Sequence, residues 1–132
     1  DDCCAASGRA PDAVISAHAH NYQRFSRNVN GRAVPYLVAG SGGFPELHRL
    51  GRGIPGPPAA FTGLPGLSLE AFQHRAFGFL TVTVDSGRAR LDYSLVVRRR
   101  PVAFDSVTVS TLSATRRRVN GLTPAASPTS IR

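Results

Sequence analysis

The sequence predicts a β-rich fold, mostly strands and loops with little helix, and three observations support this. Short apolar runs with β-branched residues recur along the chain and are separated by turns and loops. Residues 77–84 and 89–95 alternate between apolar and polar side chains around Asp85-Ser86-Gly87, which is typical of a β-hairpin. Only residues 68–74 have a helical pattern, of one or two turns with Ser68 as the cap.

The remaining elements follow in chain order. Residues 12–17 form a short apolar run and are expected as a buried strand, and 34–39 and 101–109 are expected as further strands. A polar turn at 28–31 precedes the strand at 34–39, and glycines after it free the backbone from negative φ. Between 51 and 67, nine of 17 residues are Gly or Pro, which predicts a loop without regular structure.

Length and composition indicate one globular domain. The 132 residues suffice for one domain, 42% are hydrophobic, and no apolar run approaches the ~20 residues of a membrane span. The chain has no Met, so we expect a piece of a longer protein, with residues 1–10 as the N-terminal stub of a truncated domain. Residues 113–132 are expected as a disordered basic, Pro- and Ser-rich tail. The adjacent Cys3 and Cys4 exclude a disulfide framework and leave the compartment open.

The charge balance is strongly basic, with 16 basic residues, all Arg, against 8 acidic ones and a formal net charge of +8. Arginines cluster at 98–100 and 116–118, which suits phosphate backbones. No nucleic-acid-binding motif or interleaved aromatic residue accompanies the clusters, so no specific nucleic acid is expected as a partner. A solvated basic surface explains them better, and a non-catalytic basic β-module that binds polyanions is the alternative function.

His18 and His20 follow the first predicted strand directly. If they continue that strand, both imidazoles project from one face and converge on one place. Neutral imidazole is a common ligand for Zn and Fe, so the pair is a candidate metal site, although His-x-His alone is a weak signal. His48 and His74 have no ligand spacing around them and are expected to face solvent or pack within loops.

Residues 11–25, Pro-Asp-Ala-Val-Ile-Ser-Ala-His-Ala-His-Asn-Tyr-Gln-Arg-Phe, resemble a known motif. They are similar to the last metal-binding motif of calcineurin-like metallophosphoesterases, above all the purple-acid-phosphatase branch, which has Gly-His-x-His-x-Tyr-x-Arg after an apolar strand. Residues 36–43 resemble the strand and glycine turn that follow in that family, and 77–85 and 104–109 resemble its closing strands. The resemblance covers residues 11–110, with Ala17 where the family usually has Gly.

The resemblance implies an α/β fold, of which residues 11–112 would be the C-terminal, β-rich part of a four-layer metallophosphoesterase sandwich. It implies a hydrolase that cleaves small phosphate esters with a hydroxide activated by a binuclear metal centre of Fe, Zn or Mn. His18 and His20 would each hold a different metal ion, and Tyr22 and Arg24 would support the motif. The loop of Gly40, Ser41, Gly42 and Gly43 would either present backbone N–H groups to a phosphate or form a plain tight turn. We favour the tight turn, because the loop lacks the residue spacing of a P-loop.

The other ligand motifs of the family are absent from the sequence. These are an Asp-x-His, a Gly-Asp with the bridging carboxylate, a Gly-Asn-His and one further His, and none of the eight acidic residues stands in such a context. Two imidazoles cannot hold two multivalent ions against water. We therefore expect a C-terminal fragment that is inactive alone and whose partner is the missing N-terminal half of the same domain. A non-catalytic remnant that merely folds is the alternative within the same lineage.

Overall fold

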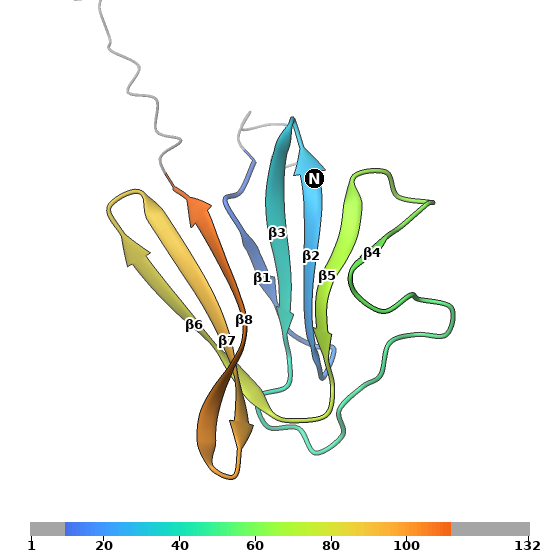
Figure 1. The fold of residues 1–132 in the computed structure, drawn as a ribbon, viewed down its shortest axis with the longest axis vertical. Coiled ribbons are helices and arrows are strands. Elements are labelled where there is room, and N and C mark those ends of the chain that lie inside the picture. The colour runs from blue at the N-terminus through green and yellow to red at the C-terminus, as the bar shows by residue number, and fades with distance from the viewer. Residues whose placement is uncertain (1–9, 112–132) are drawn as a thin grey trace, which may run out of the picture.

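The structure, a computed structural model, describes residues 10–111 and contains eight strands and no helix in that range (Figure 1). The expected tail at 113–132, with Arg116–Arg118, and nearly all of the expected stub at 1–10 lie outside the described residues. The eight strands confirm the predicted β-rich fold. Among the described residues no helix has the length and apolar character needed to cross a membrane.

The strands form two sheets. The first has five strands in the order β1-β3-β2-β5-β4, and the second has three in the order β6-β7-β8. Their bounds are β1 Val14–Ser16, β2 Tyr22–Val29, β3 Arg32–Ala39, β4 Ala59–Ala60, β5 Leu67–Gln73, β6 Gly78–Asp85, β7 Arg88–Val97 and β8 Arg100–Ser110. All neighbouring strands pair antiparallel except β1 and β3, which are parallel.

The strand predicted at 34–39 is confirmed as β3, and the two strands before it differ from the prediction. The strand predicted at 12–17 exists as β1, but it is an edge strand and Ile15 is 50% exposed, so the predicted burial is wrong. Residues 22–29, which carried no strand prediction, form β2. The predicted turn is confirmed: Asn30 and Gly31 have φ of 53° and 79°, and the Gly31 N–H donates to Asn28 Oδ1 over 2.9 Å.

Two predictions about the middle of the chain are wrong. Residues 68–74 are not helical, because Leu67–Gln73 forms strand β5, which pairs with β2 from Tyr22 to Arg27. Pairing with a long neighbouring strand outweighs the weak local preference for a helical turn. The Gly- and Pro-rich loop contains one regular piece, the two-residue strand β4, which pairs with β5.

The second sheet confirms the predicted hairpin and the last strand. Residues of β6 and β7 pair up to Asp85 and Arg88, on either side of the turn at Ser86-Gly87. β7 and β8 are joined by a turn at Arg98 and Arg99, whose φ values are 49° and 64°. The described arginine cluster is therefore an exposed hairpin turn and not part of a flat strand surface.

The core lies between the two sheets. Tyr22 and Leu37 of the first sheet pack against Leu91 and Tyr93 of the second, and the two tyrosine rings stack with centroids 3.8 Å apart. Partly buried side chains surround these four: Ala13, Ala39, Ala71, Leu80, Leu95, Val107 and Val109. Val107 and Val109 of β8 both belong to this set, so they lie on the face of β8 that packs on the core.

The inner faces of the sheets are only partly covered. Val82 lies opposite Leu91 and Val84 opposite Ala89, so both valines project from the face that carries the core. Yet Val82 is 45% exposed and Val84 71% exposed. In Figure 1 the strands of the second sheet lean away from those of the first toward the β6–β7 turn, which leaves these side chains without a partner layer among the described residues.

Candidate metal centre

The candidate site lies at one edge of the five-stranded sheet. Because β1 and β3 are parallel, their carboxyl ends meet at the same edge, and the residues that follow each strand come together there. The segment after β1 contains His18 and His20, and the segment after β3 begins at Gly40. The backbone N–H of Gly40 donates to the carbonyl oxygen of Asn21 over 3.0 Å, which joins the two segments.

His18 and His20 do not continue the first strand, so the strand-alternation argument for their convergence is wrong. β1 ends at Ser16 and β2 begins at Tyr22, and both histidines lie in the bend between them. His18 is exposed and has φ of 78°, a left-handed conformation that is uncommon outside glycine and that recurs at functional sites. The bend, and not a strand face, sets the direction of each imidazole.

His48 packs directly against His20, which the sequence reasoning missed. The two imidazole rings stack with centroids 4.5 Å apart. The ring of Phe44 also contacts the His20 ring, with centroids 4.0 Å apart. The backbone N–H of His48 donates to the carbonyl oxygen of His20 over 2.9 Å, and the N–H of His20 donates to His48 Nδ1 over 3.4 Å. The two histidines are 28 positions apart in the sequence, which hides this contact from any spacing rule.

Asn21 adds a further link between the same segments. Its side-chain amide donates to the carbonyl oxygen of His48 over 3.0 Å and its Oδ1 accepts from Gln23 over 2.9 Å. Asn21 is buried, with 2% of its surface exposed. The segment that carries His48 is therefore fixed to the histidine bend by backbone and side-chain hydrogen bonds together.

One atom of the site has an unmet bonding requirement. Nδ1 of His20 is buried and has no hydrogen-bond partner within residues 10–111, which costs about 1–3 kcal/mol for a polar group out of water. A metal ion or an acceptor from another segment would satisfy it. However, the described residues contain no group of three or more His, Cys, Asp or Glu side chains that could hold a metal ion. Within residues 10–111, the two histidines of the bend are therefore not joined by a third side chain of these types in one group.

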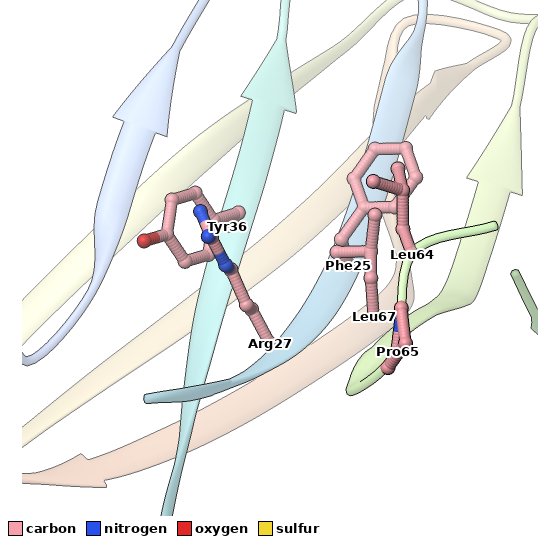
Figure 2. Close-up of a pocket in the computed structure, with 6 residues that line it drawn as sticks. All are labelled: Phe25, Arg27, Tyr36, Leu64, Pro65 and Leu67. Atoms are coloured by element: carbon pink, nitrogen blue, oxygen red, sulfur yellow. The ribbon is translucent and has the colours of Figure 1, made fainter. Parts of the chain in front are cut away.

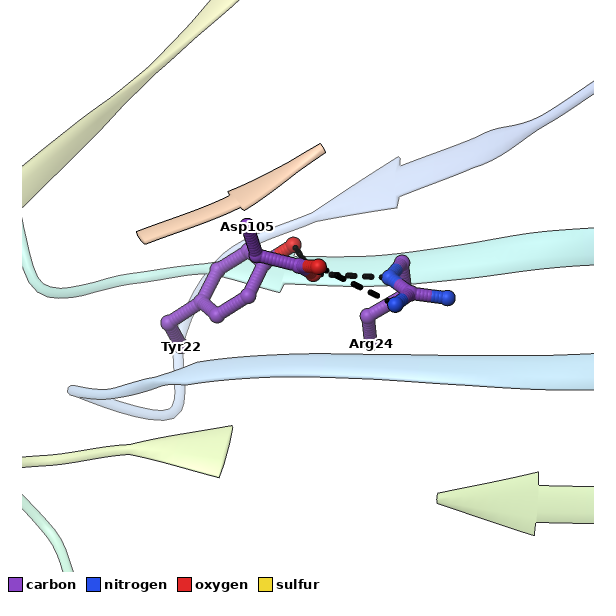
Figure 3. Close-up of polar contacts among 3 residues, drawn as sticks. All are labelled: Tyr22, Arg24 and Asp105. Carbon is purple, nitrogen blue, oxygen red and sulfur yellow. Dashed lines mark hydrogen bonds and ion pairs between the residues drawn. The ribbon is translucent and has the colours of Figure 1, made fainter. Parts of the chain in front are cut away.

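Tyr22 and Arg24, the predicted support of the motif, meet at Asp105 of β8 (Figure 3). The phenol oxygen of Tyr22 donates to Asp105 Oδ2 over 2.7 Å. Arg24 forms a two-pronged ion pair, with Nε 2.7 Å from Oδ2 and Nη2 3.0 Å from Oδ1. The side chains of Arg24 and Asp105 are only 19% and 13% exposed. These contacts clamp the start of β2 to the other sheet, next to the histidine bend.

In this clamp of Tyr22, Arg24 and Asp105, the pKa of each residue is shifted from its ordinary value. Burial raises the pKa of Tyr22, and the carboxylate of Asp105 raises it further. Burial also raises the pKa of Asp105, but the hydrogen bonds from Arg24 and Tyr22 outweigh it, so that pKa lies below its ordinary value. The ion pair with Asp105 raises the pKa of Arg24. The clamp therefore holds one negative and one positive charge at neutral pH.

The first glycine of the loop after β3 is required for close packing and not for positive φ. Gly40 has no positive φ, but a Cβ built on it would lie 2.0 Å from the carbonyl oxygen of Ala19. Gly42 and Gly43 also lack positive φ and have open space around them, so the predicted reason for these glycines is wrong. Ser41 is buried and its Oγ bonds to the hydroxyl of Tyr93, while its carbonyl oxygen accepts from the N–H of Gly78 over 3.2 Å.

No protein-family model matches the chain, and no curated protein or solved structure matches it either. The resemblance to the metallophosphoesterases therefore depends on the motif residues, and His18, His20, Tyr22, Arg24 and the glycine loop enter the next section as proposed site residues.

Proposed function

We propose that this chain contributes His18 and His20 to a binuclear metal centre, with Fe, Zn or Mn, that hydrolyses small phosphate esters. The remaining ligands would come from polypeptide outside the described residues, as the missing N-terminal half of the same domain. The observation that carries the proposal is the convergence of the histidine bend and the glycine loop at one sheet edge, where the buried Nδ1 of His20 lacks a partner among the residues that the structure describes. We expect residues 10–111 to be inactive alone, since among them no three His, Cys, Asp or Glu side chains are grouped so that they could hold a metal ion.

The roles of the chain's residues follow from their contacts. When bound, the metal pair would lower the pKa of a water molecule and neutralise charge on the phosphoryl oxygens. His20 is held for this task between Phe44 and His48, which restrict its ring. Tyr22 and Arg24 fix the strand that follows the ligands. The exposed Gly42 and Gly43 leave room for a phosphate to approach the backbone N–H groups of the loop.

The uncovered inner faces support a larger sandwich. Ile15 of the edge strand β1 is 50% exposed, and Val82 and Val84 project uncovered from the second sheet. Of the strands in the described range, β1 and β6 each pair with a single neighbour, so each has one edge that no described strand covers. A further layer of the same domain would cover these side chains and extend the sheet. This is the surface on which the missing half would dock.

Expression of the complete reading frame tests the proposal. We expect two metal ions per chain by elemental analysis and hydrolysis of an aryl phosphate. His18→Ala and His20→Ala should each lower the hydrolysis rate by at least about 100-fold, because each removes a ligand. His74→Ala is the matched control, since that ring stacks on Phe72 and belongs to no proposed site. Full activity in both ligand variants would refute the proposal, as would robust turnover by the 132-residue chain alone.

A basic module that binds polyanions is the second candidate function. Arg98, Arg99 and Arg100 are all exposed at the β7–β8 turn, which supports electrostatic binding. If this is the function, DNA or RNA binds at physiological salt, and the affinity falls steeply as salt rises. Replacing the three arginines with Ala should then abolish binding. Unchanged affinity in that variant would exclude this surface.

A further inference from the structure

Two phenylalanine rings lie next to each other on the outer face of the three-stranded sheet. A Cβ built on Gly78 would meet the hydroxyl of Tyr93, which is in the core, so position 78 faces the core. Its neighbours Phe77 and Phe79 therefore face outward, because successive residues of a strand point to opposite sides. The carbonyl oxygen of Phe77 accepts from the N–H of Val96 over 2.8 Å, which extends the β6–β7 pairing to this residue.

The arginine turn between β7 and β8 lies at the same end of the sheet. Figure 1 shows this turn at the lower end of the second sheet, the end at which β6 begins. Val96, which lies opposite Phe77, is two residues from Arg98, or about 7 Å along the strand. An arginine side chain can span that distance. The sequence shows no aromatic residue among these arginines, and the pairing of β6 with β7 brings Phe77 and Phe79 to them.

The cations at this end have no acidic partner in the described part of the chain. Arg98, Arg99 and Arg100 are exposed, and none of them forms an ion pair or a side-chain hydrogen bond within residues 10–111. Of the acidic residues in the second sheet, Asp105 belongs to the clamp and Asp92 is paired with Arg90. The third, Asp85, lies at the β6–β7 turn, the opposite end of the sheet. This end is therefore positively charged.

The two turn arginines adopt a backbone conformation that their side chains disfavour. Arg98 and Arg99 have φ of 49° and 64°. Two-residue hairpin turns with positive φ at both positions prefer Asn-Gly, Asp-Gly or Gly-Gly, because a Cβ is strained there. Strain of this kind recurs at functional sites. The geometry of the turn thus does not explain the arginines, whereas a role for their charge does.

We propose that this face binds single-stranded nucleic acid, with phosphates at Arg98 and Arg99 and bases stacked on Phe77 and Phe79. Arginines alone would attract any polyanion, but unpaired bases also stack on exposed aromatic rings, and the bases of a duplex are already stacked on each other. The proposal is independent of phosphate-ester hydrolysis. It narrows the second candidate function from polyanions in general to single strands.

Fluorescence anisotropy of a labelled oligothymidylate tests the proposal on the protein from the complete reading frame. A duplex of the same length is the matched probe, and an oligouridylate compares RNA with DNA. We expect both single strands to bind at least about 10-fold more tightly than the duplex. Phe77→Ala and Phe79→Ala should each weaken single-strand binding about 10-fold, because each removes a stacking ring. Phe79→Leu keeps an apolar side chain without the aromatic ring and should weaken binding to a similar extent, and circular dichroism checks that each variant is folded.

A double variant of the turn separates charge from folding. Arg98→Asn combined with Arg99→Gly supplies the residues that this turn prefers, so the Tm should rise. Binding should nevertheless weaken, and the slope of log affinity against log salt concentration should fall by about 0.7 for each lost phosphate contact. A more stable protein that binds less tightly cannot owe its loss of binding to unfolding.

Two control variants lie away from this face. Arg88→Gln removes an exposed charge at the β6–β7 turn. Leu64→Ala removes an exposed apolar side chain from a pocket on the five-stranded sheet (Figure 2), where the arginine of the lining, Arg27, already interacts with another group. Both variants should bind the single strands as the unaltered protein does.

Four results would overturn the proposal. These are no binding of either single strand, equal binding of single strand and duplex, unchanged binding in both phenylalanine-to-alanine variants, or an equal loss of binding in Arg88→Gln and the turn variant. Equal binding of single strand and duplex that only the turn variant weakens would return this surface to general polyanion binding. Because the measurement is of binding and not of hydrolysis, its outcome is separate from that of the metal-centre proposal.

Discussion

His20 owes its position to side chains that are distant in sequence. The rings of Phe44 and His48 pack on its imidazole, and the buried Asn21 ties the segment with His48 to the same bend. A ligand whose ring is restricted in this way loses less conformational freedom when a metal binds. We propose that His18 and His20 hold the metals and that His48 has a positioning role, which acts through His20.

Removal of the His48 ring tests that positioning role. His48→Ala should weaken Zn²⁺ binding by the protein from the complete reading frame about 10-fold, a smaller loss than for His20→Ala, because only the support of a ligand is lost. Competition with a metal chelator measures the affinity. His48→Phe keeps a ring that can stack on His20, so this variant should retain most of the Zn²⁺ affinity. Equal affinity in His48→Ala and the unaltered protein would show that the stacking has no such role.

The clamp on Asp105 predicts how stability depends on pH. Because the pKa of Asp105 in the folded state is depressed, the clamp stabilises the fold above the ordinary carboxyl pKa of about 4. This contribution is lost as the pH falls through the lower folded-state pKa. Asp105→Asn should therefore lower the free energy of unfolding by about 2 kcal/mol at pH 7 and by less at pH 3, which lies below the ordinary carboxyl pKa. Urea unfolding followed by circular dichroism at both pH values measures the difference.

Asp92→Asn is the matched control for that measurement, since Asp92 forms an exposed ion pair with Arg90 over 2.9 Å. Exposed ion pairs are screened by water and contribute little, so this variant should unfold close to the unaltered protein at both pH values. An Asp105→Asn variant with the same stability as Asp92→Asn at pH 7 would contradict the assigned role of the clamp.

Among the elements, the glycine loop and the histidine bend form one unit. The contact between Gly40 and the carbonyl oxygen of Ala19 leaves no room for a side chain, and Ala19 lies between the two histidines. Gly40→Ala should therefore lower the free energy of unfolding by about 1–3 kcal/mol and weaken metal binding, because the bend must move. Gly42→Ala, with open space around it, should change neither. Thermal unfolding and chelator competition measure both effects, and equal behaviour of the two variants would contradict the close approach.

The elements that the sequence predicted correctly are those with strong local signals. Alternation and Ser86-Gly87 located the β6–β7 hairpin, and Asn30-Gly31 located the turn before β3. The failures have tertiary causes: β5 carries a helical pattern but is paired along its length with β2. Tyr22 and Arg24 were expected as supports, yet their partner Asp105 lies more than 80 residues away on β8. The pairing of distant strands determines these contacts, and no local pattern encodes it.

At the scale of the whole molecule, the two sheets share a core at one end and diverge at the other. Val82, Val84 and Ile15 are apolar side chains that no described layer covers. We expect the 132-residue chain to fold marginally or to aggregate when expressed alone, because exposed apolar faces and free strand edges favour association. Scanning calorimetry and gel filtration measure this. A sharp, reversible unfolding transition from a monomer would contradict the expectation.

Nitrogen-15 NMR of the histidine side chains tests the central claim most directly. The protein from the complete reading frame is titrated with Zn²⁺, and the imidazole nitrogens of its histidines are followed. We expect the resonances of one ring nitrogen of His18 and one of His20 to shift as two metal ions bind, while those of His74 do not change. The same titration of the 132-residue chain should show only weak binding. Two tightly bound metal ions with both His18 and His20 unshifted would contradict the account.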